Sequence, residues 1–524
     1  MFHRLQKHLA AAILCTTALA PLPLMAQEAV FVLSTNEVGI PNYNPFTAVN
    51  TNAVFTMIYD TLVEQDGDLS FHPHLAESWD EAPDGMAWTF HLKPGVKFHN
   101  GDAFNAQAVV KWLEMFRTSE NSYMTDAIDK IEAVDDLTVK FVMKHPDPNI
   151  LYNLSSSFMG VPDPAVVAEM GEDYGISEAV GTGPFKLESF TLGQETVLVR
   201  NDDYAWASPL SANQGPPTIK KLTLREIAED STAFLELKTG GVDALLSLPT
   251  DYLGEIGSDQ SLALMKIAGQ ELYYMPINVT KEPFTDIRVR EAAALAINQK
   301  EILENVFANY GAVANNFLIS ALPESKIDPA YDISYNPDKA NGLLDEAGWV
   351  MGSDGVRAKD GKRLSVSLWT QSDSVFRRLT EVVQAQLKAV GIEATITTYD
   401  SSTIRDQYKT GEQQLAVRSY FWSNADIVDW FFGADRLGYP NVSMFNDPKA
   451  EELRAKAMAG SATQAERVAN FTAYHQYVTS QFPYAPIYQP EQNMAYNKDR
   501  IVMPDVIHGT SITGTVMLDV SVKE

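Results

Sequence analysis

The sequence has almost no cysteine and no long apolar run beyond its first 26 residues. Its one cysteine, Cys15, lies in that N-terminal stretch, so residues 27–524 contain no disulfide of their own. No later segment approaches the run of about 20 apolar residues that a membrane-spanning helix needs. Repeats, heptads and low-complexity linkers are missing as well. What remains is an ordinary globular composition, and 524 residues suffice for two or more domains with separate cores.

The first 26 residues have the pattern of a secretory signal peptide. Arg4 and Lys7 precede the apolar stretch LAAAILCTTALAPLPL, and Ala26 ends a cleavage site. Leu14 is a poor match to the small residue that a lipoprotein signal needs before its cysteine. We therefore expect residues 1–26 to be removed and the rest of the chain to be exported to the periplasm.

Basic residues are scarce relative to acidic ones. The chain has 40 Lys and Arg against 68 Asp and Glu, a net charge of −28. Loss of the signal would remove two of the 40 basic residues and none of the 68 acidic ones, which leaves 38 and a net charge of −30. Such a charge disfavours nucleic acid and anionic lipid as partners. It places no limit on a small ligand, which meets only its own pocket.

Two segments alternate between strand and helix periodicity. Residues 219–227 predict a strand, DSTAFLELKTGG a helix ended by glycines, and VDALLSL a second strand. The same order recurs when a strand at 364–368 is followed by helical spacing to Val390, Gly391 and a strand from Ile392. Two such units, about 150 residues apart, predict two α/β lobes.

Between residues 71 and 180, ahead of the first of these units, the hydrophobic pattern is different. WTFHLKPGVKFHNG and KIEAVDDLTVKFVMKHP predict hairpins, and Val109, Leu113 and Phe116 lie on one face of a helix between them. We interpret residues 71–180 as an α+β insertion in the first lobe. LYYMPINVT (272–280) and YAPIYQPEQNMAYN (484–497) are predicted to cross between the lobes, so that both chain ends build the first lobe.

These segments also resemble a known family. LVEQDGDLSFHPHLAESWDEAPDGMAWTFHLKPGVKFHNGDAFNAQAVV, residues 62–110, is similar to the signature region of the solute-binding proteins that serve bacterial importers of peptides, opines and nickel. The similarity continues in order through GTGPFKLESF, FLELKTGGVDALLSLP, FTDIRVREAAALAIN, DGVRAKDGKRLSVSLW, WSNADIVDWFF and NVSMFNDPKAEEL.

The resemblance implies an α/β fold of the two-lobed periplasmic-binding-protein kind (type II-like), with the additional α+β subdomain in the first lobe. The expected division assigns 27–70, 181–272 and 483–524 to the core of lobe I, 71–180 to its extra subdomain and 273–482 to lobe II. It further implies a monomer that captures an oligopeptide or peptide-like solute and delivers it to an ABC permease. An opine, a sugar conjugate and a metal chelate are alternative ligands.

The stretch YFWSNADIVDWFF places two carboxylates, Asp426 and Asp429, among large aromatic side chains. A buried carboxylate ionises only beside a cation, hydrogen-bond donors or water. In the family, an aspartate after this tryptophan receives the α-ammonium group of a bound peptide, and Asp426 is the first match, with Asp429 second. The alternative is that one aspartate caps the following helix and that both are solvated. A more remote alternative is a secreted hydrolase that uses the two carboxylates as a pair.

Alternation along AVRSYFW places Arg418, Tyr420 and Trp422 on one face of a strand. If this face lines the cleft, Arg418 is suited to a ligand carboxylate or phosphate, and the two rings to a pocket wall. An internal ion pair for Arg418, and core positions for the rings, remain alternatives. Some dipeptide binders carry an arginine in the loop after SVSLW, but here TQSDSVF has no base before Arg377, which argues against a strict dipeptide ligand.

The stretch STNEVGIPNYNPF resembles the first cleft loop of the family, which makes Val38 and Asn42 candidate ligand contacts; a plain surface turn is the alternative. The densest histidine group is expected to be structural and not a metal site; it comprises His72, His74, His91 and His99. No cofactor is predicted. Motifs of nucleophilic or phosphate-transfer enzymes are missing, and DGVRAKDGKR is better explained as a β-hairpin. We therefore expect a binding protein and not an enzyme.

Overall fold

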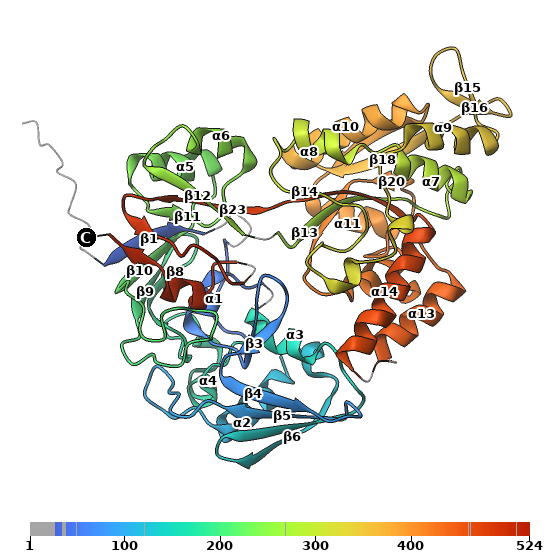
Figure 1. The fold of residues 1–524 in the computed structure, drawn as a ribbon. Coiled ribbons are helices and arrows are strands. Elements are labelled where there is room, and N and C mark those ends of the chain that lie inside the picture. Colours follow the sequence, from blue (N-terminus) through green and yellow to red (C-terminus); the bar gives the residue numbers. More distant parts are fainter. Residues whose placement is uncertain are drawn as a thin grey trace, which may run out of the picture.

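The structure, a computed structural model, describes residues 27–33, 38–48, 50–119, 121–267, 269–459, 461, 463–509 and 511–523. The expected signal peptide and residues 34–37 of the expected cleft loop lie outside these ranges. Figure 1 shows two lobes side by side, with a further subdomain below the first. None of the helices in the described ranges combines the length and apolar character that crossing a membrane requires.

A seven-stranded sheet forms the centre of the first lobe. Its middle strand, β1, runs parallel to the strands on both sides, β10 and β11, as predicted for a strand–helix–strand unit. The helix between them, α5 (Asp230–Thr239), ends at Gly240, whose φ of 77° requires a left-handed conformation. In order, the strands are β12 (Leu262–Ile267), β23 (Gln492–Asn497), β11 (Ala244–Leu245), β1 (Glu28–Val32), β10 (Lys221–Arg225), β9 (Glu195–Arg200) and β8 (Phe185–Thr191).

The inserted subdomain contains a four-stranded antiparallel sheet. Its order is β4 (Ala76–Glu81), β5 (Ala87–Leu92), β7 (Thr138–Met143) and β6 (Ile128–Asp135). The predicted hairpin at 130–146 is confirmed as β6–β7. The hairpin predicted at 88–101 is wrong, because β5 pairs with β4 and β7 and the chain turns away at Gly95, where φ is 80°. The helices are α2 (Ala106–Phe116), α3 (Ile150–Ser155) and α4 (Pro164–Met170).

In α2, the side chains of Val109, Leu113 and Phe116 are all buried, as their spacing predicted. The hairpin of β2 (Val63–Gln65) and β3 (Phe71–Pro73) leads into the insertion and contacts α3. The short helix α1 (Ala53–Ile58) packs against α15 (Gly514–Leu518), which brings an N-terminal and a C-terminal segment together in the first lobe.

The second lobe has two sheets. One contains β18 (Ser365–Gln371) between β19 (Glu393–Tyr399) and β20 (Leu415–Ala416), all parallel, and α10 (Ser374–Ala389) connects β18 to β19 as predicted. The other has the order β14 (Ala312–Val313), β22 (Tyr484–Gln489), β13 (Glu271–Pro276) and β21 (Arg418–Phe421). DGVRAKDGKR forms the predicted hairpin of β16 (Arg357–Lys359) and β17 (Lys362–Arg363).

Further helices cover these sheets and complete the lobe. They are α7 (Ile287–Leu295), α8 (Gln299–Asn305), α9 (Pro337–Glu346), α11 (Ser401–Lys409), α12 (Ile427–Phe432), α13 (Pro448–Ala459) and α14 (Gln464–Ser480). In Figure 1, α14 and α13 descend from this lobe toward α3 of the inserted subdomain.

Two chain segments cross between the lobes (Figure 1): one leads from β12 to β13, and the other leads from β22 to β23. The second crossing lies within the predicted stretch 484–497, whereas the first precedes the predicted stretch 272–280, which belongs to the second lobe. The expected boundaries at 272/273 and 482/483 need correction. Because Leu272, Tyr484 and Tyr488 are buried in the core of the second lobe, β13 and β22 belong to that lobe in full. We therefore propose that the lobes divide after β12, which ends at Ile267, and after β22, which ends at Gln489.

Each lobe has its own hydrophobic core. The larger cluster of the first lobe contains only residues from 29–246, 267 and 494–520, and the larger cluster of the second lobe contains residues from 272–488 together with Leu69. Leu69 belongs to the turn between β2 and β3, has φ of 66°, and is buried. This turn of the first lobe thus inserts one apolar side chain into the second.

Candidate ligand-binding site

The segment after β21 carries the two aspartates singled out by the sequence. Asp426 occupies the N-cap position of α12, yet its side chain forms no capping hydrogen bond. Instead the indole Nε1 of Trp422 donates to Asp426 Oδ1 at 2.7 Å. The capping alternative for Asp426 is therefore wrong.

Asp426 as a whole is partly buried. The pKa of Asp426 is raised to about 6, chiefly by burial and to a smaller extent by the negative charges of Asp429 and Asp147; the Trp422 hydrogen bond and the charge of Arg467 act in the opposite direction. Among the described residues, no Lys, Arg or His lies within 4 Å of this carboxylate. Its charge thus has no basic partner of its own.

Asp429 has a different environment. Its side chain is 1% exposed, and it forms ion pairs with Arg454 and with Arg436, whose Nη2 lies 3.2 Å from Oδ2. The guanidinium of Arg436 also lies 3.9 Å from the ring centroid of Trp430. The prediction that Asp429 contacts a ligand is not supported, because two arginines of the protein already occupy both carboxylate oxygens. The same pairing removes the basis for a hydrolytic carboxylate pair.

The inserted subdomain brings two tyrosines to Asp426. The rings of Tyr152 and Trp422 lie 6.3 Å apart, and Tyr152 also interacts with Ser423. Burial, and then the charge of Asp426, raise the pKa of Tyr152 and of Tyr123. Asp426 therefore lies where the inserted subdomain meets the second lobe.

A polar bridge joins the same two parts of the molecule beside Asp426. Asn149, at the start of α3, accepts hydrogen bonds from Arg467 in α14 and, at 3.1 Å, from Asn424 Nδ2. Arg467 also forms a buried ion pair with Glu324. Sequence reasoning missed these residues, since they are far apart along the chain and none belongs to a recognisable motif.

The predicted strand parity is correct, but the face it defines points largely into the second lobe. Tyr420 is 6% exposed and its hydroxyl donates to the Phe317 carbonyl, so it is a core residue and the prediction of a ligand contact is not supported. Trp422 is half-buried beside Asp426 and remains a candidate. Phe421, on the opposite face, is 63% exposed, and nothing in its sequence pattern singled it out.

Arg418 is 7% exposed and its guanidinium carbon lies about 5 Å from three aromatic ring centroids. Its Nη1 donates to the Pro440 carbonyl at 3.1 Å. No carboxylate of the described chain pairs with it, so the internal ion pair that the sequence left open is not formed. The three rings belong to Tyr408, Phe431 and Tyr439.

The described part of the first predicted loop is held by its own chain. Asn42 Oδ1 accepts from Asn44 N at 3.0 Å and from Thr47 Oγ1 at 3.3 Å, and Val38 packs against the core of the first lobe. The backbone N–H of Gly39 donates to Glu226 at 2.9 Å. Ligand contacts by Val38 and Asn42 thus remain predictions, and their side chains already have structural roles.

The histidines lie in separate places. His74 is buried and lies 3.2 Å from Asp60, His91 lies 3.1 Å from Asp80, and His99 Nε2 lies 3.0 Å from the Gly183 carbonyl. His72 groups with Asp66 and Asp68 closely enough for a metal ion. These carboxylates already accept hydrogen bonds from the turn that they form, and Asp66 also pairs with His508, so this group gives no support for a metal site.

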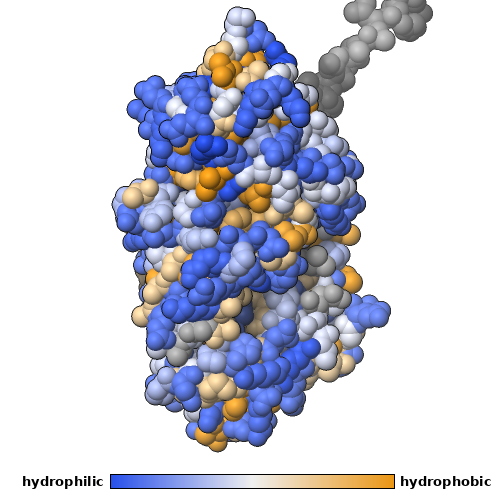
Figure 2. Space-filling model, turned by 90° about the vertical axis from the view of Figure 1, so that its right-hand side faces the viewer, coloured by the Kyte–Doolittle hydropathy of each residue, from blue (hydrophilic) through white to orange (hydrophobic). Residues whose placement is uncertain are grey.

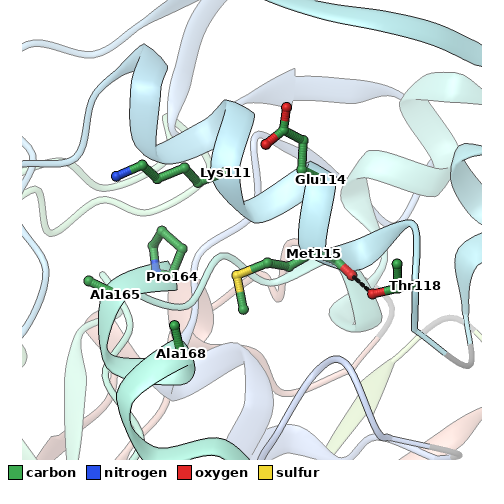
Figure 3. A pocket seen from close by; sticks show the side chains of 7 residues that line it. All are labelled: Lys111, Glu114, Met115, Thr118, Pro164, Ala165 and Ala168. Carbon is green, nitrogen blue, oxygen red and sulfur yellow. Dashed lines mark hydrogen bonds between the residues drawn. The ribbon is translucent and has the colours of Figure 1, made fainter.

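A surface groove of about 470 Å³ lies between α2 and α4 of the inserted subdomain. Figure 3 shows Met115 reaching between these helices toward Ala168. None of the predicted site residues lines it; the lining residues are Lys111, Glu114, Met115, Thr118, Pro164, Ala165 and Ala168.

The face of the second lobe in Figure 2 is mostly hydrophilic, and its hydrophobic side chains lie in small separate groups where described residues cover it.

Comparison with known proteins identifies the family. Residues 70–435 match the bacterial extracellular solute-binding proteins, family 5, middle region. The chain is 28% identical to the glutathione-binding protein GsiB of Pectobacterium atrosepticum over 462 residues, which cover 84% of this chain and 85% of the relative. It is also 28% identical to the dipeptide-binding protein of Escherichia coli K12, with 74% and 75% of the chains covered.

Among solved structures, NikA from Brucella suis in complex with Fe(III)-EDTA superposes with a TM-score of 0.80 at 22% identity, covering 95% of this chain and all of the other. This likeness shows the two-lobed periplasmic-binding-protein fold. Proteins of the family are binding proteins, and members work with ABC permeases. The chain thus belongs to the bacterial extracellular solute-binding proteins of family 5, and its role is to bind a substrate.

Proposed function

We propose that this protein binds an oligopeptide or peptide-like solute through a free ammonium group, which Asp426 holds where the two lobes meet. The observation that carries the proposal is the partly buried Asp426 carboxylate, which has one hydrogen bond from Trp422 and no basic partner among the described residues. An ammonium group would supply the missing charge in a charge-assisted hydrogen bond. The glutathione-binding and dipeptide-binding relatives support a ligand of this class.

We further propose that the protein acts as an exported periplasmic monomer, which passes its ligand to an ABC permease without changing it. Contacts between the lobes at Asn149 and Leu69 support a mechanism in which closure around the ligand produces the form that a permease recognises. Light scattering in solution tests the monomer. Incubation with a bound ligand tests the absence of turnover, because a binding protein returns it intact.

The decisive experiment recovers the natural ligand. The protein, expressed with its own leader and purified from the periplasm, is denatured, and the released small molecules are identified by mass spectrometry. We expect compounds with a primary amine, present in stoichiometric amount. Recovery of a discrete compound without an amine, such as a sugar conjugate or a metal chelate, would contradict the proposal.

Variants connect that ligand to the site. In Asp426→Asn the charge is lost while the shape and the Trp422 contact are kept, and we expect affinity for the amine ligand to fall by about 2 to 5 kcal/mol. Asp435→Asn is the matched control, because the Asp435 side chain is 57% exposed and Arg454 is its one ion-pair partner among the residues that the structure describes. Equal affinity of Asp426→Asn and wild type in calorimetry would exclude the ammonium site.

A further inference from the structure

The glutamine side chains that are buried in the described chain differ in whether their amide groups have partners. Gln299, Gln386 and Gln413 each donate from Nε2 to a backbone carbonyl. Gln270 is 6% exposed, and its Nε2 is buried without a hydrogen-bond partner among the described residues. A buried amide that has left water without gaining a new acceptor is costly, so its retention at this position requires a physical reason.

Gln270 lies in one of the two segments that join the lobes, directly before the first residue of β13. At the other crossing, Gln489 is the last residue of β22, and both ends of its amide are used. Its Nε2 donates to the Gly269 carbonyl at 3.0 Å, and its Oε1 accepts from Ser320 N at 3.0 Å. Gln489 thus holds the joint between the lobes together, whereas the Gln270 amide makes no such contact with the described residues.

The strand register places Gln270 opposite Trp422. In the antiparallel pair of β13 and β21, Leu272 lies opposite Tyr420. The Trp422 N–H donates to the Gln270 carbonyl at 3.1 Å, so the pairing extends to these two residues. Side chains that face each other in this way leave the same face of the sheet, with Cβ atoms about 5 Å apart. Because the Trp422 indole donates to Asp426, the side chains of Gln270 and Asp426 are both neighbours of this indole.

The two neighbours of the indole offer complementary groups, since the Asp426 carboxylate accepts and the Gln270 Nε2 donates. An aminoacyl group carries an ammonium and a carbonyl oxygen on neighbouring carbons, so it presents a donor and an acceptor close together. We propose that Gln270 determines ligand specificity by donating a hydrogen bond from Nε2 to the carbonyl oxygen next to the ammonium group that Asp426 holds.

The inference rests on the proposed function and narrows the class of ligand. The solute is then a compound with a free N-terminal aminoacyl group, as in a peptide, and not a bare alkyl amine such as a polyamine. A site that buries a donor for the carbonyl rejects ligands without one, because the donor then stays unpaired.

Thermal unfolding of the ligand-stripped protein tests whether the Gln270 amide is kept for a ligand. Gln270→Leu replaces the unpaired amide by an apolar group, and Gln270→Met does so at nearly the original length. We expect both variants to unfold at the wild-type temperature or above it. Gln299→Leu is the contrasting variant and should unfold at a lower temperature, because its amide donates to the Ile333 carbonyl. A lower temperature for both Gln270 variants would overturn the proposal, because it would show that the amide is paired within the protein.

Two analogues of tri-alanine test the hydrogen bond itself by calorimetry. In the first analogue, sulfur replaces the carbonyl oxygen next to the ammonium, which keeps the shape nearly unchanged but gives a weaker acceptor. In the second analogue, the control, the carbonyl of the middle residue carries the sulfur. We expect wild type to bind the first analogue about tenfold more weakly than tri-alanine and the second equally well, and Gln270→Leu to bind all three with the same affinity. Equal affinity of wild type for tri-alanine and the first analogue would contradict the proposal.

N-acetyl-tri-alanine separates this proposal from the proposed function, because it lacks the ammonium and keeps the carbonyl. If acetylation weakens binding while the first sulfur analogue binds as well as tri-alanine, Gln270 is not the donor and Asp426 stands. The reverse result rejects the ammonium site at Asp426 and keeps Gln270 as a donor to the ligand carbonyl.

Ligand that co-purifies from the periplasm gives a test that does not depend on tri-alanine. The amount released per protein on denaturation is measured for wild type, for Gln270→Leu and for the control Gln194→Leu, whose side chain is exposed. We expect Gln270→Leu to carry less ligand than the other two, and the released compounds to contain an aminoacyl group. Equal amounts in all three proteins, or a ligand whose amine has no neighbouring carbonyl, would overturn the proposal.

Discussion

Asn149 of the inserted subdomain accepts hydrogen bonds at 2.9 and 3.1 Å from the guanidinium of Arg467 in the second lobe. The two residues are 318 positions apart, and their contact lies beside the segment that carries Asp426. The inserted subdomain therefore contacts the second lobe beside the place where we expect the ligand amine, and we expect this contact to form part of the closure that we propose.

Replacement of Asn149 by alanine should loosen that closure. A hydrogen bond to a charged group contributes about 1.5 to 3 kcal/mol, and its loss leaves Arg467 with fewer acceptors. We expect protein purified with its ligand to show a larger radius of gyration in small-angle scattering. Asn153→Ala is the matched control, since Asn153 lies in the same helix but donates to Met124 within the subdomain. Identical radii for wild type and Asn149→Ala would contradict this role.

Asp426 should make stability depend on pH in an unusual direction for an aspartate. Its pKa is raised to about 6, above the value of about 3.9 expected in the unfolded chain. Between these values the folded state holds the proton and the unfolded state does not, so stability falls as pH rises from about 4 to 6. Asp426→Asn should therefore stabilise the ligand-free protein at pH 7.5 by about 1 to 3 kcal/mol and have little effect at pH 4. Urea unfolding at both pH values measures this, and an equal effect at both would refute it.

Asp429 should behave as a structural residue. Asp429→Ala leaves the partly buried Arg454 and Arg436 without their shared partner, and we expect a loss of about 3 to 5 kcal/mol in the free energy of unfolding. Asp435→Ala removes an exposed partner of the same Arg454 and should cost at most about 1 kcal/mol. Urea denaturation of both variants provides the comparison. A mild effect of Asp429→Ala, combined with lost ligand binding, would restore it as a site residue.

Leu69 should stabilise the closed arrangement of the lobes. Its side chain is buried against the core of the second lobe although its backbone belongs to the first. Leu69→Ala removes that contact, and we expect the ligand dissociation constant to rise about tenfold, equivalent to about 1.4 kcal/mol. Leu235→Ala, at a leucine that is 60% exposed, serves as the control. Unchanged affinity in Leu69→Ala would show that this contact does not contribute to closure.

The sequence predicted the two strand–helix–strand units because their hydrophobic periodicity is local and Gly240 and Gly391 mark the helix ends. It also indicated Asp426, because a carboxylate among aromatic rings is unusual within one short segment. The family resemblance ranked Asp426 before Asp429, but the pairing of Asp429 with Arg454 was not predicted, since it depends on a contact 25 residues away that periodicity does not encode. Tyr152 and Asn149 were out of reach for the same reason.

The position of β23 sets an order for folding. This strand lies between β12 and β11 inside the sheet of the first lobe, yet its residues are among the last 33 of the chain. Until they emerge, β12 has no neighbour through which to join that sheet, whereas the strands and helices of the second lobe are already complete in sequence. Because such distant pairing is slow to form, the first lobe must remain unfinished while most of the chain is made. A nascent chain of this design therefore stays open at its N-terminal lobe until synthesis is nearly over.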